Sequence, residues 1–191
     1  MAINQNRNSV RVLRTTAAGH LLHKNIPNLS IGTGKVFTIQ LWVVKGKDTD
    51  GVLYSQEGGF SIQLVDGQAV FTLDGFATLS AGTDWKVGAH RQDYIAVRYQ
   101  SGKLALFLGG LKIAEKSVSA KASACTGDFA IGKQFTGGFS LIRVSKTARS
   151  DRELLSDNAA PPGVDSHCVF QSDCSGVQYQ DASANHLSMW A

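Results

Sequence analysis

The sequence predicts an all-β sandwich. Short segments in which apolar and polar residues alternate recur along the chain, at spacings of about 8 to 12 residues that are typical of such folds. Turn-forming pairs such as Asp66-Gly67 and Asp74-Gly75 separate several of them. Asp-Gly is a strong signal for a two-residue hairpin, because glycine adopts the positive φ that these turns need. Only one segment of note, which starts at Ser150, is expected to be helical.

The clearest segment is a three-stranded meander over residues 93–115. Its expected strands are residues 94–99, 104–108 and 111–114, joined by the pairs Ser101-Gly102 and Gly109-Gly110. Alternation in the first strand puts three apolar side chains on one face: Ile95, Val97 and Tyr99. The meander offers no catalytic arrangement, so we interpret it as scaffold.

The same alternation predicts short strands along the rest of the chain. Outside the meander they are residues 10–13, 20–22, 36–44, 52–55, 60–65, 68–73, 77–80, 129–131, 138–145, 169–170, 177–179 and 187–190. One helical turn is expected after Ser150, because Ser150 and Glu153 have the spacing of a capping box. Residues 159–163, with the sequence AAPPG, end this turn.

Length and charge indicate a single domain over residues 1–191, with a basic arm at about residues 1–9. The chain has a net charge of +4, and its basic residues Arg7, Arg11 and Arg14 precede any acidic residue. Such an arm can contact phosphates, anionic glycans or an acidic partner. No aromatic stacking pattern accompanies it, so we favour a solvated terminus over specific nucleic-acid binding.

Several classes of protein are not expected. No stretch approaches the roughly 20 apolar residues of a membrane span, and the N-terminus lacks the apolar core of a signal peptide. Three cysteines without a CxxC pair argue against a disulfide framework or a zinc ribbon. We expect Cys125, Cys168 and Cys174 to be free, partly buried thiols, although a turn could bring Cys168 and Cys174 together.

Five segments in order resemble the laminin G-like, concanavalin A-like jelly-roll superfamily. FTIQLWV (residues 37–43) resembles an early strand of that family, and residues 58–73 resemble its next hairpin. The meander YIAVRYQSGKLALFLGGLKIA (94–114) and residues 135–154 are similar to its centre and its close. The tail, residues 168–190, resembles a segment that often precedes the first strand in family members. The resemblance implies a two-sheet antiparallel jelly roll.

The resemblance also brings expectations about metals and catalysis. Family members often bind calcium through early acidic residues, but residues 14–22 here (RTTAAGHLL) contain none. Calcium prefers several carboxylate ligands, so we expect no metal and no cofactor. Related glycoside hydrolases need two carboxylates across the scissile bond. The three glutamates, Glu57, Glu115 and Glu153, are isolated in the sequence, so we expect no enzyme.

A sugar-binding site would need an exposed aromatic side chain with polar groups at its rim. Trp85 is the best candidate, because it lies in an expected loop with His90 and Arg91 nearby in sequence. Tyr54 and Trp42 are weaker candidates, since each lies on an expected strand. For Trp85 two interpretations stay open: a platform for a ligand, or a loop residue that covers the edge of the sandwich.

Three functions are compatible with these patterns. The first is a non-enzymatic structural or surface-display module of a larger assembly such as a phage virion, either virion-associated or cytoplasmic before assembly. Its partners would be other proteins of that assembly and a surface glycan. We also expect it to form a homo-oligomer. The second is a stand-alone lectin, and the third is a glycoside hydrolase. The first is suggested by a chain that starts at Met1 without an export signal.

Overall fold

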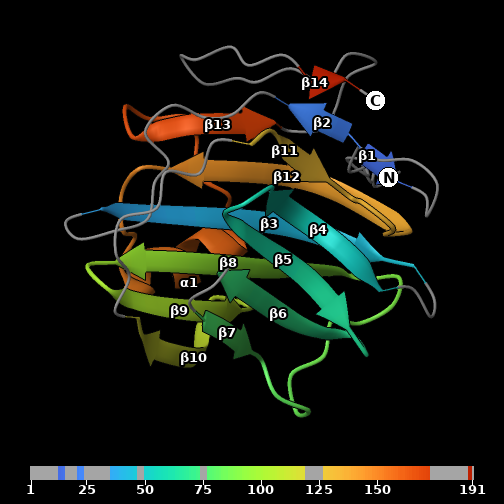
Figure 1. Cartoon of the computed structure of the whole chain (residues 1–191), viewed down its shortest axis with the longest axis horizontal. Helices are drawn as coiled ribbons and strands as arrows, with labels where there is room; N and C mark the ends of the chain where they lie inside the picture. Colours follow the sequence, from blue (N-terminus) through green and yellow to red (C-terminus); the bar gives the residue numbers. More distant parts are fainter. Residues whose placement is uncertain are drawn as a thin grey trace, which may run out of the picture.

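The protein is a sandwich of two antiparallel sheets with one helix on the outside (Figure 1). The computed structural model describes residues 13–15, 21–23, 35–46, 50–73, 77–118, 127–172 and 189–190. The predicted basic arm at residues 1–9, the predicted strand at 177–179 and the predicted thiols Cys125 and Cys174 lie outside the described residues. No helix in the described part is long and apolar enough to cross a bilayer.

The first sheet has the strand order β1-β12-β3-β8-β9-β10, and β13 pairs with β12 as well. Its strands are β1 (Leu13–Thr15), β3 (Val36–Lys45), β8 (Gln92–Gln100), β9 (Lys103–Leu108), β10 (Leu111–Ser117), β12 (Gly137–Ser145) and β13 (Cys168–Ser172). The predicted meander is confirmed as β8–β9–β10. Positive φ at Ser101, Gly102, Gly109 and Gly110 closes its two turns, as two-residue hairpins require.

The second sheet has the order β14-β2-β11-β4-β5-β6-β7. Its strands are β2 (Leu21–His23), β4 (Gly51–Gln56), β5 (Phe60–Val65), β6 (Gln68–Leu73), β7 (Ala77–Ser80), β11 (Phe129–Ile131) and β14 (Met189–Trp190). The strand near the C-terminus, β14, pairs with β2 near the N-terminus. Two strands from opposite ends of the described chain therefore lie side by side at one edge of the second sheet, as Figure 1 shows.

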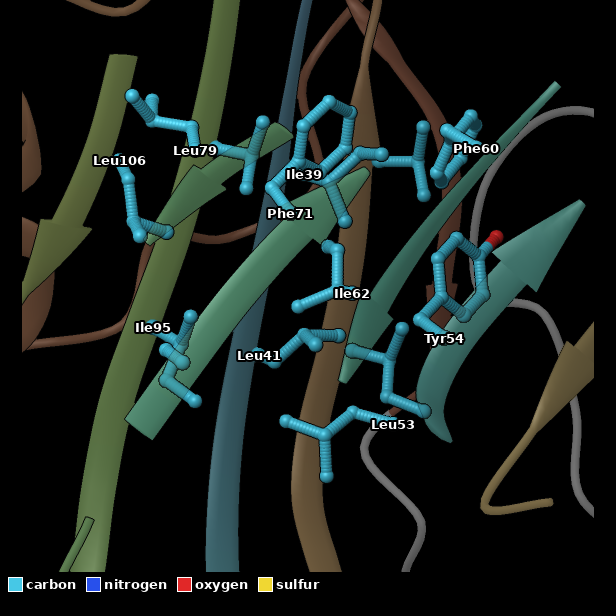
Figure 2. Close-up of a cluster of buried hydrophobic side chains, with 14 of the residues drawn as sticks. Ile39, Leu41, Leu53, Tyr54, Phe60, Ile62, Phe71, Leu79, Ile95 and Leu106 are labelled. Carbon is cyan, nitrogen blue, oxygen red and sulfur yellow. The ribbon is translucent and has the colours of Figure 1, made fainter. Parts of the chain in front are cut away.

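The core fills the space between the two sheets. Figure 2 shows its side chains pointing inward from both layers. On β3, for example, Phe37, Ile39 and Leu41 are buried and face the second sheet. Aromatic rings add packing across the layers: Phe37 of β3 stacks with Phe60 of β5 at 6.2 Å between ring centroids. These contacts account for the period-2 pattern that predicted the strands.

The outer face of the first sheet is buried as well, beneath helix α1 (Asp151–Ala159). A second apolar cluster forms there, in which Trp42 and Tyr94 pack against Leu154 of the helix. The capping box is confirmed: the Glu153 amide donates to the Ser150 hydroxyl, and the Glu153 carboxylate accepts from the Ser150 amide. The expected single helical turn is thus nine residues long.

Buried polar groups fix α1 to this face. Asp157 of the helix accepts a hydrogen bond from Gln40 Nε2 of β3 at 2.8 Å, and Arg149 Nη2 donates to Asp157 at 2.8 Å. Gln40 Nε2 also lies 2.8 Å from the Tyr94 hydroxyl. Burial raises the pKa of Tyr94, so its phenol stays neutral. These hydrogen bonds hold α1 in a defined position over β3 and β8.

Loss of the buried carboxylate should destabilise the protein strongly. Asp157→Ala removes the closest partner of the largely buried Arg149 guanidinium, whose other carboxylate neighbours lie 3.9 Å away. Breaking a buried pair costs about 3–5 kcal/mol. Asp151→Ala is the matched control on the same helix: its ion pair with Arg98 is half exposed, and we expect a loss of at most about 1 kcal/mol. Urea unfolding measures both. Equal losses would contradict the assignment.

The tight turn beneath the helix offers a second test. A Cβ on Gly110 would lie 2.7 Å from the Leu155 Cα, whereas a Cβ on Gly109 would meet nothing within 4 Å. Both residues have positive φ, so each alanine substitution pays a similar backbone strain of about 1 kcal/mol. We expect Gly110→Ala to lower the thermal midpoint clearly more than Gly109→Ala. If Gly109→Ala lowered the midpoint more than Gly110→Ala, α1 would not pack closely against this turn.

Candidate functional site

The candidate site is the loop of residues 81–91, which crosses from β7 of the second sheet to β8 of the first. Its backbone is tied to both sheets. The Val87 amide donates to the Gly67 carbonyl at 2.8 Å, and the His90 amide donates to the Lys45 carbonyl at 2.9 Å. Val87 is buried and closes this end of the core. The loop is therefore held at several points along its length.

Trp85 is a large apolar side chain that the loop leaves in solvent. The residue is 41% exposed, and its amide donates to the Gly82 carbonyl at 3.4 Å in a local turn. The next residue, Lys86, forms a β-bridge with Gln68 at the start of β6. A partly exposed indole on a fixed backbone can stack on the apolar face of a sugar at a low cost in entropy.

Arg91 is a positioned cation in the same loop. Its Nε donates to Asp93 Oδ2 at 3.2 Å, and the Gly88 amide donates to the same oxygen at 2.8 Å. The guanidinium folds over Gly88, where an added Cβ would lie 2.3 Å from Arg91 Nε. The side chain remains 64% exposed, so its outer N–H groups can donate to a ligand. His90 beside it is exposed and has φ of +58°.

A polar brace connects the neighbouring loops. Asp50, which precedes β4, accepts from the Gly67 amide at 3.1 Å and lies 3.5 Å from Lys45 Nζ at the end of β3. Gly67 in turn holds the candidate loop through Val87. The β3–β4 connection, the β5–β6 turn and the loop 81–91 therefore support one another. The sequence pattern does not single out Lys45 or Asp50, although both lie in the polar stretch KGKDTDG (residues 45–51) between two expected strands.

Tyr54 does not belong to this site. It is fully buried, and its ring stacks on Phe129 at 5.1 Å between centroids. The reason is a β-bulge: the pairing of β4 with β5 shifts between Val52 and Tyr54, so that Leu53 and Tyr54 both point into the core. Trp42 is likewise buried, against Tyr94. The structure thus brings Trp85, His90 and Arg91 into one loop and places Tyr54 in the core.

Two carboxylates near the loop, those of Asp93 and Asp50, are engaged as structural partners. Asp93 holds Arg91 and Gly88, and Asp50 holds Gly67. The glutamates lie on three different elements: Glu57 follows β4, Glu115 pairs with Lys112 on β10, and Glu153 caps α1. No group of three or more metal-ligating side chains occurs within the described residues. The arrangement is suited to binding through stacking and hydrogen bonds.

Comparison with known proteins shows the fold. No protein-family profile and no curated protein matches the sequence. Solved structures do match. A candidate carbohydrate-binding protein from Bacteroides ovatus aligns with a TM-score of 0.73 at 16% identity, over 94% of this chain and 57% of that one. The chain therefore spans little more than half the length of that protein.

Two further structures match over most of their own length. Domain 4 of an extracellular arabinanase from Geobacillus stearothermophilus, solved with arabinotriose, aligns with a TM-score of 0.58 at 12% identity, over 76% of this chain and 75% of that one. A heptameric pentraxin from Limulus polyphemus also gives 0.58, at 11% identity, over 94% and 95%. The chain thus has the two-sheet antiparallel jelly-roll fold of these domains.

The contact between Gly88 and Arg91 leads to a prediction about the site itself. Gly88→Ala should push the Arg91 guanidinium away from Asp93 with little loss of stability, because the clash is with the end of a flexible side chain. The Arg91 Nε–H resonance should shift and broaden in ¹H–¹⁵N NMR spectra. Gly163→Ala, where an added Cβ meets nothing within 4 Å, should leave that resonance unchanged. An unperturbed resonance in Gly88→Ala would refute the arrangement.

Proposed function

We propose that the chain is a non-enzymatic carbohydrate-binding module of the laminin G-like, concanavalin A-like superfamily. The observation that carries this proposal is Trp85, a partly exposed indole on a loop that both sheets hold in place. Arg91 and His90 supply hydrogen-bond donors at its rim. Proteins with the same fold whose names refer to carbohydrates support the proposal. The site itself is argued from this chain's own residues.

Binding is favoured over catalysis by the state of the acidic residues. Hydrolysis of a glycosidic bond needs two carboxylates that face the same bond. Of the three glutamates, Glu115 lies 3.0 Å from Lys112 Nζ and Glu153 accepts from the Ser150 hydroxyl at 2.7 Å. Hydrogen bonds from Ser150 hold the pKa of Glu153 below its ordinary value, which does not suit a general acid.

Assembly into an oligomer is the second part of the proposal. A heptameric pentraxin shares the fold over nearly its whole length, and a sugar-binding module gains avidity when several copies act together. The expected role as a virion display module stays a prediction, because nothing in the fold or in the comparisons bears on a virion. Light scattering coupled to size exclusion gives the number of copies.

A glycan array with purified protein and a Trp85 series tests the proposal. Trp85→Ala should weaken binding at least about tenfold, because the central aromatic of a binding site contributes more than about 1.4 kcal/mol. Trp85→Phe keeps a ring and should recover part of the affinity. Leu155→Ala, which changes another half-exposed apolar residue on α1, should bind like the wild type. Absence of glycan binding, or binding indifferent to Trp85, would refute the site.

A further inference from the structure

The segment between β12 and β13, residues 146–167, carries α1 across the outer face of the first sheet, and we call it the strap. Little apolar contact holds the strap in place. Of the nine residues of α1, Leu154 and Asp157 are buried, whereas Leu155 is 49% exposed. Leu154 packs on the apolar side chains of the sheet beneath it, which are Trp42, Tyr94, Ala96, Ala105, Phe107 and Leu141. The strap therefore depends on polar contacts to stay closed.

Opposite charges face each other across the interface between the strap and the sheet. The sheet presents Arg143 on β12 and Arg98 on β8, and the strap presents an aspartate to each. Arg143 Nη2 donates to Asp165 Oδ2 at 2.6 Å, and Arg98 Nη1 donates to Asp151 Oδ1 at 2.6 Å. The Arg143 side chain is fully buried, and burying an uncompensated charge is costly. The closed strap therefore requires Asp165 to be ionised.

Several polar atoms beneath the strap are buried without compensation. Five of them have no hydrogen-bond partner within the described protein: Gln40 Oε1, Trp42 Nε1, Arg143 Nε, Arg143 Nη1 and Ser145 Oγ. All lie on the neighbouring strands β3 and β12. Burial of an unpartnered polar atom is unfavourable, so these atoms favour an open strap, in which water reaches them. Without its ion pairs the strap would therefore gain little by closing.

The ionisation of the strap aspartates depends on their partners in the sheet. Burial alone would raise the pKa of Asp165, but hydrogen bonds from Arg143 and from the His167 amide hold it below its ordinary value. The hydrogen bond from Arg98 likewise lowers the pKa of Asp151. A carboxylate whose pKa is lowered in this way stabilises the closed strap above its ordinary pKa of about 4. This stabilisation is lost as the pH falls below that value.

The other groups around the strap do not offset this loss in acid. The next cations are Arg149, 3.9 Å from Asp165, and Lys112 of β10, 3.7 Å from Asp151, and both stay charged. These cations also face the carboxylates of Asp157, Glu153 and Glu115. Burial raises the pKa values of the two neutral groups, Tyr94 of β8 and Cys168 of β13. The exposed cationic or titratable groups at the edges are Lys103, Lys146, Arg152 and His167.

The core between the two sheets has no comparable dependence on pH. Among the described residues, the buried charged side chains are Arg143 and Asp157, and both lie at the interface with the strap. Apolar and aromatic side chains fill the space between the sheets, and their packing does not change with ionisation. Acid therefore acts on the strap before it acts on the sandwich.

We propose that the strap is an acid-released cover, closed at neutral pH and displaced from the first sheet below about pH 4 while the two sheets stay folded. Opening exposes the apolar side chains of β3, β8, β9 and β12 that Leu154 covers. The outer face of the first sheet thereby changes from a polar surface to an apolar one. The inference goes beyond glycan binding and does not depend on it.

Hydrogen exchange of the whole chain, followed by mass spectrometry between pH 7 and pH 3, tests the inference. After correction for the intrinsic pH dependence of exchange, the protection of the α1 amides should fall at least tenfold between pH 6 and pH 3. Protection of the amides of β3 and β5 should fall less than threefold. The dye ANS, which binds exposed apolar surface, should gain fluorescence over the same range. Equal losses in α1 and the sheets, or no loss in α1, would overturn the inference.

Charge-neutral variants test the mechanism at a single pH. Asp165→Asn removes the partner of Arg143, whereas Asp66→Asn makes the same change in the exposed β5–β6 turn. At pH 7 we expect Asp165→Asn to lower the protection of α1 at least tenfold, and Asp66→Asn to leave it within twofold of the wild type.

A double variant separates release by charge from simple damage to the strap. Arg143→Met combined with Asp165→Asn removes both charges, and apolar side chains can replace a buried ion pair without loss of stability. The protection of α1 should then return to within threefold of the wild type. A double variant as open as Asp165→Asn would overturn the inference, because the buried arginine would not be what opens the strap.

A milder variant keeps the inference testable if Asp165→Asn does not fold, which circular dichroism shows. Asp151→Asn removes the half-exposed pair with Arg98 and should lower the protection of α1 about threefold at pH 7. Unchanged protection in Asp151→Asn would then count against the inference, together with a wild-type protection of α1 that does not change with pH.

Discussion

Burial of the first sheet on both of its faces is the constraint from which the rest of the structure follows. In β3 the residues Phe37 to Val43 are buried without interruption, so neither face of this strand can be left to water. The second sheet covers one face and α1 covers the other. No such demand applies to the second sheet, whose strands alternate between buried and half-exposed residues. The molecule is therefore asymmetric: one sheet is enclosed, and the other presents a surface.

The two covers of the first sheet rely on different interactions. Between the sheets the contacts are apolar and aromatic, and they are not directional. Under α1 they include the carboxylate of Asp157 between Gln40 and Arg149. Buried pairs of this kind add little net stability over an apolar equivalent, but removing one partner is costly. We infer that the network determines where the helix sits, because Leu154 alone would permit several positions on an apolar surface.

Much of the fold could be predicted from local patterns, because each hairpin carries its own signal. The meander from Gln92 to Ser117 follows from alternation and two turns, and the capping box at Ser150 follows from its spacing. The prediction that Tyr54 belongs to the binding site was wrong, because a β-bulge changes which residues of β4 share a face. The alternation of apolar and polar residues gives no sign of the residue that the bulge inserts. The position of α1 could not be predicted either. Its burial depends on the contacts of Asp157 with Arg149 and Gln40, and an aspartate in a short polar helix is expected at the surface.

The site was predictable to the extent that it lies within one loop. Trp85, His90 and Arg91 are close in sequence, so their proximity needs no knowledge of the fold, whereas the brace of Lys45, Asp50 and Gly67 depends on contacts between distant segments.

Identities of 11–16% to structures of the same fold carry no residue roles, so the location of a binding surface has to come from this chain's architecture. Because α1 closes the outer face of the first sheet, the described surfaces left for an extended ligand are the end loops and the face of the second sheet. Gln68 joins these two surfaces, since it pairs with Val65 on the face and with Lys86 in the loop. The loop that carries Trp85 is therefore continuous with the outer face of the second sheet.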